Sequence, residues 1–361
     1  MSERTNTAKW VESRKRWQIN VQKDGVRKTF SSAKPGRTGQ REANAKADEW
    51  LSHTVVKSST KVSALYPQFL ATKEATTSKS NYLPMEGRWR NKIDPIIGNK
   101  AIGRLTIGDL QDVVDRALAE GYARKSLQNL RADISAFLKW CRKHKYSTLT
   151  AEDVEIPKSA KPSERRILQP QDMIVLFNVD TTVIHGQRVE EPYINAFRLE
   201  VLTGMRPGEI NGLRWEDWSG DQINLRRAIN TYGEETTGKN ANAKRAIYLS
   251  SLARQTLEAQ HELTGPKGSM FCISNLKHYY RSWKRYCKVN GLPDITTYEI
   301  RHTFVSISDA LPEAQMKKLV GHSRSMDTYG VYGHTISGEG DEISRNLDNI
   351  FGKLLEGEQA N

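Results

Sequence analysis

The sequence is poor in cysteine and contains no long apolar run. Its three cysteines, Cys141, Cys272 and Cys287, are odd in number and lack metal-ligand spacing, so we expect neither a disulfide framework nor a zinc site. No uninterrupted apolar stretch approaches the length that spans a bilayer, and residues 1–10 are polar rather than a charged and then apolar export signal. The sequence therefore predicts a cytoplasmic protein.

Acidic residues are also few relative to basic ones. The 361 residues include 55 Lys and Arg against 42 Asp and Glu, a formal net charge of +13. A cationic surface gains affinity for nucleic acid because binding releases counterions from the phosphates. The charge predicts a polyanionic partner, although a solvated lysine surface would explain the charge alone equally well. The length and the 37% hydrophobic content predict two or three domains.

Residues 1–57 are predicted to form a small β-sheet followed by a helix. Apolar and polar residues alternate over 17–21, and Asp24 and Gly25 supply a tight turn before a second strand over 26–30. A helix is expected from about 42 to 51. Basic side chains crowd this segment, and the candidates for DNA contact are Arg14, Arg16 and Lys28. A sheet with this density of cations fits a DNA groove, and the alternative is a solvated miniature domain.

Residues 58–155 are predicted to form a helical domain, with helix from 61 to about 154. Thr106, with Asp109 three residues on, opens one helix, and Gly121 closes it. A second helix has an apolar stripe and a basic surface, on which the candidates for DNA contact are Arg131, Lys139 and Arg142. Residues 156–166 contain two prolines and two serines and read as an exposed linker. The remainder, 167–361, is expected to be mostly helical with one β-hairpin, over 222–227 and 245–249.

Four short segments of this last domain contain candidate catalytic side chains. They are Thr-Gly-Met-Arg-Pro-Gly-Glu with Arg206, the turn region of the hairpin with Lys239, Tyr-Glu-Ile-Arg-His with Tyr298 and Arg301, and a final stretch with His322 and Tyr332. Tyr332 follows His322 by ten residues. Tyr329, one turn earlier, competes with Tyr332 for the role of nucleophile; the resemblance described next implies Tyr332, through its ten-residue offset and the Tyr-Gly-His ending.

In these segments the chain resembles the tyrosine recombinase family, which includes the integrases of phages and conjugative elements. The family pattern has a Thr-Gly-Leu-Arg turn, a hairpin lysine, a His-x-x-Arg-His pair, a Gly-His, and a tyrosine ten residues after that histidine. The segments occur here in the same order and spacing. Met205 in place of leucine is a packing-neutral change. Tyr298 stands where the family more often has histidine, and we expect it to support the site through a hydrogen bond rather than to transfer protons.

The resemblance implies a mainly α fold with small β-sheets in three domains. These are an N-terminal β-sheet domain that binds arm-type DNA sites (1–57), a SAM-like helical core-binding domain (58–155) and, after the linker (156–166), a mixed α/β catalytic domain (167–361). The implied reaction leaves a 3′-phosphotyrosine and a free 5′ hydroxyl, and it needs no metal, ATP or other cofactor. The implied partners are double-stranded DNA attachment sites and a homotetramer on DNA, with excisionase and DNA-bending proteins as candidate accessory factors.

The residue types also suit this chemistry without the family name. Arg206 and Arg301 offer planar donor forks that stay charged and match a phosphate. Cations near Tyr332 favour the ionised phenol, which is the nucleophile. Lys239 is assigned as the general acid for the departing oxygen, and His322 as a donor to a non-bridging oxygen or an aid to proton transfer. His302 is expected to stabilise the fold.

The end of the chain and two rival functions complete the expectations. An apolar stripe recurs at helical spacing through Ile343, Leu347, Ile350, Phe351, Leu354 and Leu355. This C-terminal helix docks on its own catalytic domain or, as the resemblance favours, it is exchanged and docks on the catalytic domain of a neighbouring protomer. The rival functions are DNA relaxation of the type IB topoisomerase kind and a catalytically silent DNA-binding regulator.

Overall fold

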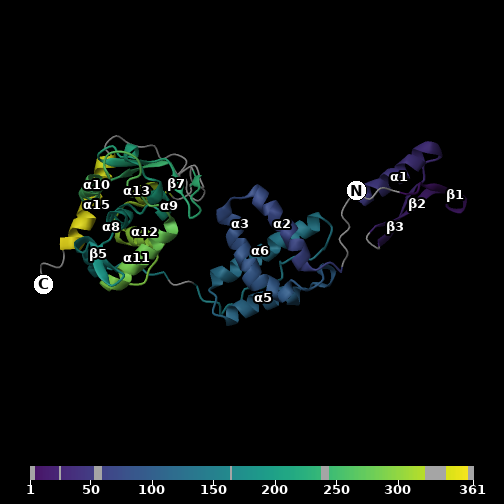
Figure 1. Cartoon of the computed structure of the whole chain (residues 1–361), viewed down its shortest axis with the longest axis horizontal. Helices are drawn as coiled ribbons and strands as arrows, with labels where there is room; N and C mark the ends of the chain where they lie inside the picture. Colours follow the sequence, from purple (N-terminus) through teal and green to yellow (C-terminus); the bar gives the residue numbers. More distant parts are fainter. Residues whose placement is uncertain are drawn as a thin grey trace. The chain divides into compact units, whose positions relative to one another are not determined.

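The computed structural model describes residues 5–23, 26–52, 59–162, 165–236, 244–321 and 339–356. The chain divides into two compact units, Met1–Ser163 and Glu164–Asn361. Helices with small sheets make up both units (Figure 1), which confirms the predicted fold class. Within the described ranges, no helix combines the length and the apolar character that crossing a bilayer requires.

The first unit begins with a three-stranded antiparallel sheet covered by a helix. Its elements are β1 (Lys9–Val11), η1 (Glu12–Arg14), β2 (Arg16–Lys23), β3 (Val26–Ser32) and α1 (Gly36–Ser52). The predicted hairpin is confirmed, with β2 and β3 paired from Trp17 and Ser32 to Lys23 and Val26; the turn at Asp24 and Gly25 lies outside the described residues. The helix begins six residues before the predicted start. Gly36 and Gly39 lower the helix propensity of its first turns, so the sequence pattern did not reveal them. Ala43, Ala47 and Leu51 of α1 pack on Ile19 and Val21, and this burial stabilises the helix.

The rest of the first unit is a helical domain with its own core. Its elements are α2 (Val62–Thr76), α3 (Lys79–Arg88), η2 (Trp89–Ile93), α4 (Asp94–Ile97), η3 (Ile102–Arg104), α5 (Ile107–Ala119) and α6 (Arg124–Lys143). The predicted start at Thr106 is confirmed: Thr106 Oγ1 accepts from the Asp109 N–H and the Asp109 carboxylate accepts from the Thr106 N–H. The expectation of helix up to residue 154 is wrong beyond α6. Lys145 adopts a left-handed φ of 58°, which a helix does not tolerate.

The second unit combines nine helices of the described residues with three two-stranded sheets. The elements are α7 (Pro170–Asn178), β4 (Thr181–Ile184), β5 (Gln187–Glu190), α8 (Ile194–Thr203), α9 (Pro207–Gly212), η4 (Trp215–Asp217), β6 (Gln222–Leu225), β7 (Ala228–Ile229), β8 (Glu235–Thr236), β9 (Arg245–Tyr248), α10 (Ser251–Thr264), α11 (Leu276–Asn290), α12 (Thr297–Ile307), α13 (Glu313–Val320) and α15 (Glu339–Glu356). The predicted pairing is confirmed, since β6 pairs with β9.

Two further hairpins were not predicted from the sequence. β4 pairs with β5 across His185 and Gly186, both of which have positive φ, as a tight hairpin turn requires. β7 pairs with β8 between the two predicted strands. Four strands of two to four residues each are too short to show a clear alternation in the sequence.

The C-terminal helix α15 packs on its own unit in the single chain. Ile343, Leu347 and Phe351 are buried in the core of that unit. The carboxylate of Asp348 accepts hydrogen bonds from the N–H and the hydroxyl of Ser251, at 2.6 and 2.9 Å, at the start of α10. Docking on the same domain, one of the two alternatives left open by the sequence, is therefore the arrangement of the single chain. Exchange with a neighbouring protomer stays a prediction about an assembly on DNA.

Candidate active site

Arg301 joins three segments that are far apart in the sequence. From α12 its Nη1 donates to the carbonyl of Gly204 at 2.5 Å and its Nη2 to the carbonyl of Val320 at 2.6 Å. Gly204 ends α8 with φ of +62°, and a Cβ on it would lie 2.3 Å from the Phe304 ring, so both the conformation and the space require glycine. Arg301 thereby fixes the loop that leads to Arg206 and the end of α13.

Arg206 stands at the N-terminus of α9, directly after that loop. Its N–H and its Nη1 both donate to the Glu209 carboxylate at 2.9 Å. Its side chain keeps 36% of its exposure, whereas Arg301 is buried. A guanidinium has five N–H donors, so Arg206 retains donors that are free to bind an anion.

Glu209 and Arg245 complete this site, although the sequence analysis gave neither a role. Arg245 of β9 donates through both Nη atoms to Glu209, at 3.1 and 3.0 Å, and through Nε to the Leu319 carbonyl at 2.7 Å. Burial alone would raise the pKa of Glu209, but the hydrogen bonds from Arg245 and Arg206 bring that pKa below its ordinary value. The sequence signal that could have identified Glu209 is the presence of an acid three residues after Arg206.

Positive charge exceeds negative charge in this group of side chains. We call Arg206, Arg245 and Arg301 with Glu209 the open arginine cluster, in which three guanidinium groups face one ionised carboxylate. Burial, together with the charges of Arg206 and Arg245, lowers the pKa of Arg301 to about 10, which still leaves it charged at neutral pH. The cluster is therefore suited to bind a dianionic or monoanionic oxyacid group such as a phosphate.

The nearby carboxyl group of Glu200 does not cancel this charge. Glu200 is fully buried in α8, and one of its oxygens accepts from the Tyr279 hydroxyl at 2.7 Å. The other oxygen has no hydrogen-bond partner among the described residues. Burial raises the pKa of Glu200 well above its ordinary value, more than Tyr279 and Arg301 lower it. Burial thus favours the uncharged form of Glu200 beside the open arginine cluster.

Tyr298 lies one turn before Arg301 on α12. Its side chain is half exposed, and its ring meets that of His302 edge to face, with centroids 5.5 Å apart. Burial and the charge of Arg165 lower the pKa of His302, which favours its uncharged form. The structure brings Arg206, Tyr298 and Arg301 together at α9 and α12. The other candidates, Lys239, His322 and Tyr332, and the competing Tyr329, lie outside the described residues.

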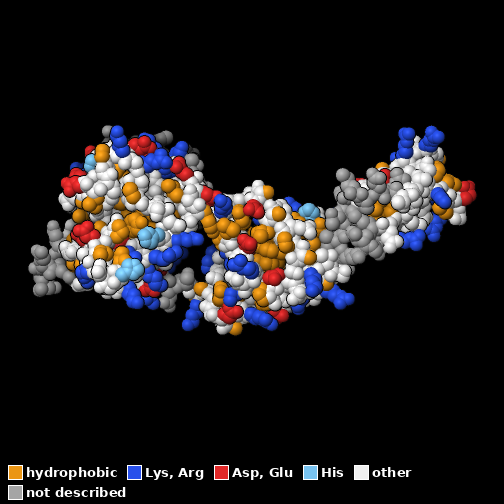
Figure 2. Space-filling model, viewed as in Figure 1, with side chains coloured by type: hydrophobic (Ala, Val, Ile, Leu, Met, Phe, Trp, Pro, Cys, Tyr) orange, Lys and Arg blue, Asp and Glu red, His pale blue; other side chains and the backbone are white. Residues whose placement is uncertain are grey.

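The candidates for DNA contact in the sheet domain do not share one face. In β2 the residues that alternate with Ile19 and Val21 point away from α1, and Arg16 is one of them. The register pairs Lys28 with Val21, so Lys28 is on the side covered by α1, where its Nζ lies 5.4 Å from the Phe30 ring centroid. Arg27, opposite Gln22, is on the open face with Arg16. Arg14 is exposed at the end of η1, and more Lys and Arg than Asp and Glu are visible on this domain (Figure 2).

Two of the candidates on α6 have internal partners. Arg131 donates to the Val154 carbonyl at 3.1 Å and Arg142 to the Leu149 carbonyl at 2.9 Å. Both side chains therefore fix the non-helical segment after α6. Lys139 is exposed. Periodicity in the sequence identified the surface of α6 but not the chain that returns across it.

The chain is similar in sequence to known proteins. The model of the phage integrase family matches residues 169–337. The chain is 24% identical to the ICEBs1 integrase of Bacillus subtilis, over 76% of this chain and 79% of that protein. It is also 24% identical to the tyrosine recombinase XerC of Corynebacterium glutamicum, over 64% and 75%.

Solved structures show the same fold. The Tn1549 transposon integrase in complex with a circular intermediate DNA superimposes with a TM-score of 0.61 at 18% identity, over 80% of this chain and all of that one. A lambda integrase tetramer bound to a Holliday junction superimposes with a TM-score of 0.57 at 14% identity, over 90% and 98%.

Proposed function

Because the chain belongs to the tyrosine recombinase family, with a phage integrase match over residues 169–337, we propose that it cleaves and religates DNA through a 3′-phosphotyrosine on Tyr332. We further propose that it integrates or excises a mobile element. The observation that carries the proposal is the open arginine cluster, in which Arg206 is accessible and the positive charge is in excess. Such fixed donors stabilise the charge that develops on a phosphate during transfer.

The proposed reaction has the following steps. Arg206 and Arg301 bind the non-bridging oxygens of the scissile phosphate, and Tyr298 and His322 donate further hydrogen bonds. The Tyr332 hydroxyl releases its proton to solvent, and its oxygen forms a bond to phosphorus while the bond from phosphorus to the 5′ oxygen breaks. Lys239 gives a proton to that leaving oxygen. Attack by a 5′ hydroxyl of a partner duplex reverses these steps, so the energy of the ester bond is conserved without ATP.

The remaining parts of the chain are assigned to DNA contact and assembly. The sheet domain contributes Arg14, Arg16 and Arg27, with Lys28 at its rim, and the helical domain contributes Lys139 together with the remaining donors of Arg131 and Arg142. The lambda integrase was solved as a tetramer on a Holliday junction, which supports a homotetramer on DNA here. The protein acts in the cytoplasm, where its attachment sites are, and excisionase and DNA-bending proteins are its candidate accessory partners.

The test is covalent capture of DNA. The full chain is incubated, in buffer with EDTA, with a pool of randomised duplexes nicked so that the cleaved strand cannot be religated, and adducts that survive detergent are sequenced. We expect adducts at a defined sequence. Tyr332→Phe abolishes them because it lacks the nucleophilic oxygen.

Tyr329→Phe is the matched control, since it removes a neighbouring phenol and leaves capture unchanged if Tyr332 is the nucleophile. Loss of adducts in Tyr329→Phe alone would transfer the role to Tyr329. Relaxation of plasmids without dependence on sequence would favour topoisomerase activity, and sequence-specific binding without any adduct would favour the silent regulator.

A further inference from the structure

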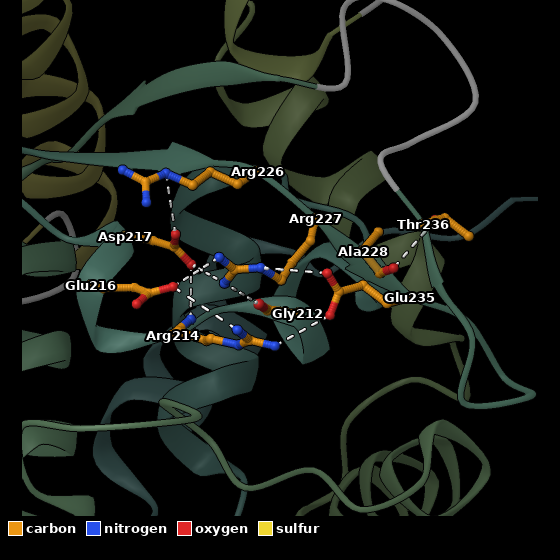
Figure 3. Close-up of polar contacts among 9 residues, drawn as sticks. All are labelled: Gly212, Arg214, Glu216, Asp217, Arg226, Arg227, Ala228, Glu235 and Thr236. Carbon is orange, nitrogen blue, oxygen red and sulfur yellow. Dashed lines mark hydrogen bonds and ion pairs between the residues drawn. The ribbon is translucent and has the colours of Figure 1, made fainter.

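A second group of charged side chains lies at the other end of α9. Asp217 is buried, and its Oδ2 accepts from the Arg214 N–H at 3.0 Å and from Arg227 Nη1 at 2.8 Å. Arg227 is nearly buried and also donates to the Gly212 carbonyl at 3.3 Å and to Glu216 at 3.0 Å (Figure 3). Arg226, more exposed, lies 3.7 Å from Asp217 Oδ1. We call Arg214, Arg226, Arg227, Glu216, Asp217 and Glu235 the closed arginine cluster.

This cluster connects α9 to the hairpin formed by β7 and β8. Glu235, the first residue of β8, accepts from Arg214 Nη2 at 3.2 Å and lies 3.9 Å from Arg227 Nε. Arg227 directly precedes β7, so it reaches α9, η4 and β8 from one position in the chain (Figure 3). Removal of its guanidinium would break the contacts of all three elements at once.

The backbone of β7 also lies directly against α9. A Cβ on Gly208 would be 3.1 Å from the Ile229 carbonyl, and a Cβ on Gly212 would be 2.9 Å from the Arg227 carbonyl. The two glycines are four residues apart and therefore share one side of the helix. The hairpin is thus packed on the same short helix that presents Arg206.

The closed arginine cluster is not suited to bind DNA phosphate. Its three guanidinium groups face three carboxylates, and Asp217 and Arg227 are shielded from solvent. A cluster whose positive and negative charges balance offers no excess charge to an anion. Its contacts are instead those of a structural connection between α9 and β8.

The hairpin is followed closely by the proposed general acid. Thr236 ends β8, and Lys239 comes three residues later, a span of about 10 Å at most for an extended chain. At the far side of the same segment, Arg245 of β9 is bonded to Glu209 of α9. β9 is therefore hydrogen-bonded to α9 directly, whereas β8 is connected to α9 through Arg227, which donates to the Gly212 carbonyl and lies 3.9 Å from Glu235.

We propose that Arg227 is a positioning residue for protonation of the leaving oxygen: it fixes the β7–β8 hairpin, whose last residue, Thr236, precedes Lys239 by three residues, relative to the helix that presents Arg206. This inference rests on the proposed function. In the step concerned, the bond from phosphorus to the 5′ oxygen breaks and that oxygen takes a proton from the Lys239 ammonium group. A displacement of Lys239 slows this transfer while phosphate binding by Arg206 and Arg301 continues.

The test compares two duplexes that carry the captured site. One has the ordinary 5′ bridging oxygen at the scissile phosphate and the other has sulfur there, which leaves as a thiolate and needs no proton. On the oxygen duplex we expect Lys239→Ala to slow adduct formation ~100-fold or more and Arg227→Ala about 10-fold, within the range of general-acid catalysis. On the sulfur duplex both variants should return to nearly the wild-type rate.

Arg226→Ala is the matched control, because it removes the adjacent, exposed arginine and the same charge; it should behave as the wild type on both duplexes. Glu235→Gln, whose side chain is half exposed, is a milder variant that keeps the test valid if Arg227→Ala does not fold. It should show a smaller loss that sulfur again restores. Equal losses on both duplexes for these two variants, or no loss at all, would overturn the inference. A wild-type chain that forms no adduct on either duplex would instead refute the recombinase chemistry.

Discussion

The open and closed arginine clusters are built from the same sequence element and end in opposite states. Arg206 is followed three residues later by Glu209, and Arg214 by Asp217, and in both pairs the arginine N–H donates to the carboxylate of the later residue. Around Glu209 three guanidinium groups meet one carboxylate, whereas around Asp217 three meet three. The comparison teaches that an arginine is available to bind a phosphate when the fold places fewer carboxylates than guanidinium groups around it.

Substitution of the two leading arginines tests this difference most directly. Arg206→Ala should slow adduct formation about 100- to 1,000-fold, which is the usual effect of removing one protein donor that stabilises the charge developing on the transferred group. Arg214→Ala should show only a small fraction of that loss, since the charge of Arg214, although 46% of its side chain is exposed, is balanced by Glu235 and the other carboxylates of the closed cluster. Both variants keep the backbone N–H that caps the helix. Single-turnover adduct formation measures the effect, and equal losses in the two variants would remove the distinction between the clusters.

Removal of the negative charge from each of the two buried carboxylates, Glu209 and Asp217, should have different effects on the free energy of unfolding. Glu209→Gln leaves three guanidinium groups without a carboxylate and should lower the free energy of unfolding by about 3 kcal/mol or more. Asp217→Asn should cost about 1–2 kcal/mol, because Arg227 keeps its contacts with Glu216 and Glu235. Urea unfolding at neutral pH measures both. A larger cost for Asp217→Asn would contradict the assignment of charge in the two clusters.

The Glu209 carboxylate also makes the stability of the protein depend on pH. The folded state holds the pKa of Glu209 below its ordinary value of 4.5, so the unfolded chain binds the proton first as the pH falls. The stabilisation from Glu209 is complete above that value and is lost as the pH falls through the folded pKa. Wild-type stability should therefore decrease in this acidic range, and the decrease should be weaker in Glu209→Gln.

The smallest effect concerns Glu200, whose uncharged form adds no negative charge beside the open cluster. Its folded pKa lies above the ordinary value of 4.5, so the folded state binds a proton that the unfolded chain releases, and stability falls as the pH rises from that value towards the folded pKa. Glu200→Gln has no such proton, and its stability relative to the wild type should rise by about 1 kcal/mol per pH unit across this window. Unfolding at pH 5, 6 and 7 measures the trend. A difference that is constant with pH would mean that Glu200 is ionised.

Local patterns in the sequence predicted the elements that have a local sequence signature. The capping pair of Thr106 and Asp109, the alternation in β2 and the stripe of α6 are properties of short chain segments, because backbone geometry alone sets their periods of 3.6 and 2. The four short strands of the second unit and the first turns of α1 were not predicted. Their stability comes from packing on distant segments, which outweighs weak local propensity.

The sequence by itself determined the identity of the candidate catalytic residues, since the order and spacing of Arg206, Lys239, Arg301, His322 and Tyr332 are one-dimensional facts. Only the tertiary structure decided the state of the side chains. It bonded Arg301 to a carbonyl 97 residues away and Arg245 to a carboxylate 36 residues away, placed Arg27 rather than Lys28 on the open face of the sheet, and gave Arg131 and Arg142 internal partners. Exposure and net charge are sums over neighbours in space, and neighbours in space are set by the packing of whole elements.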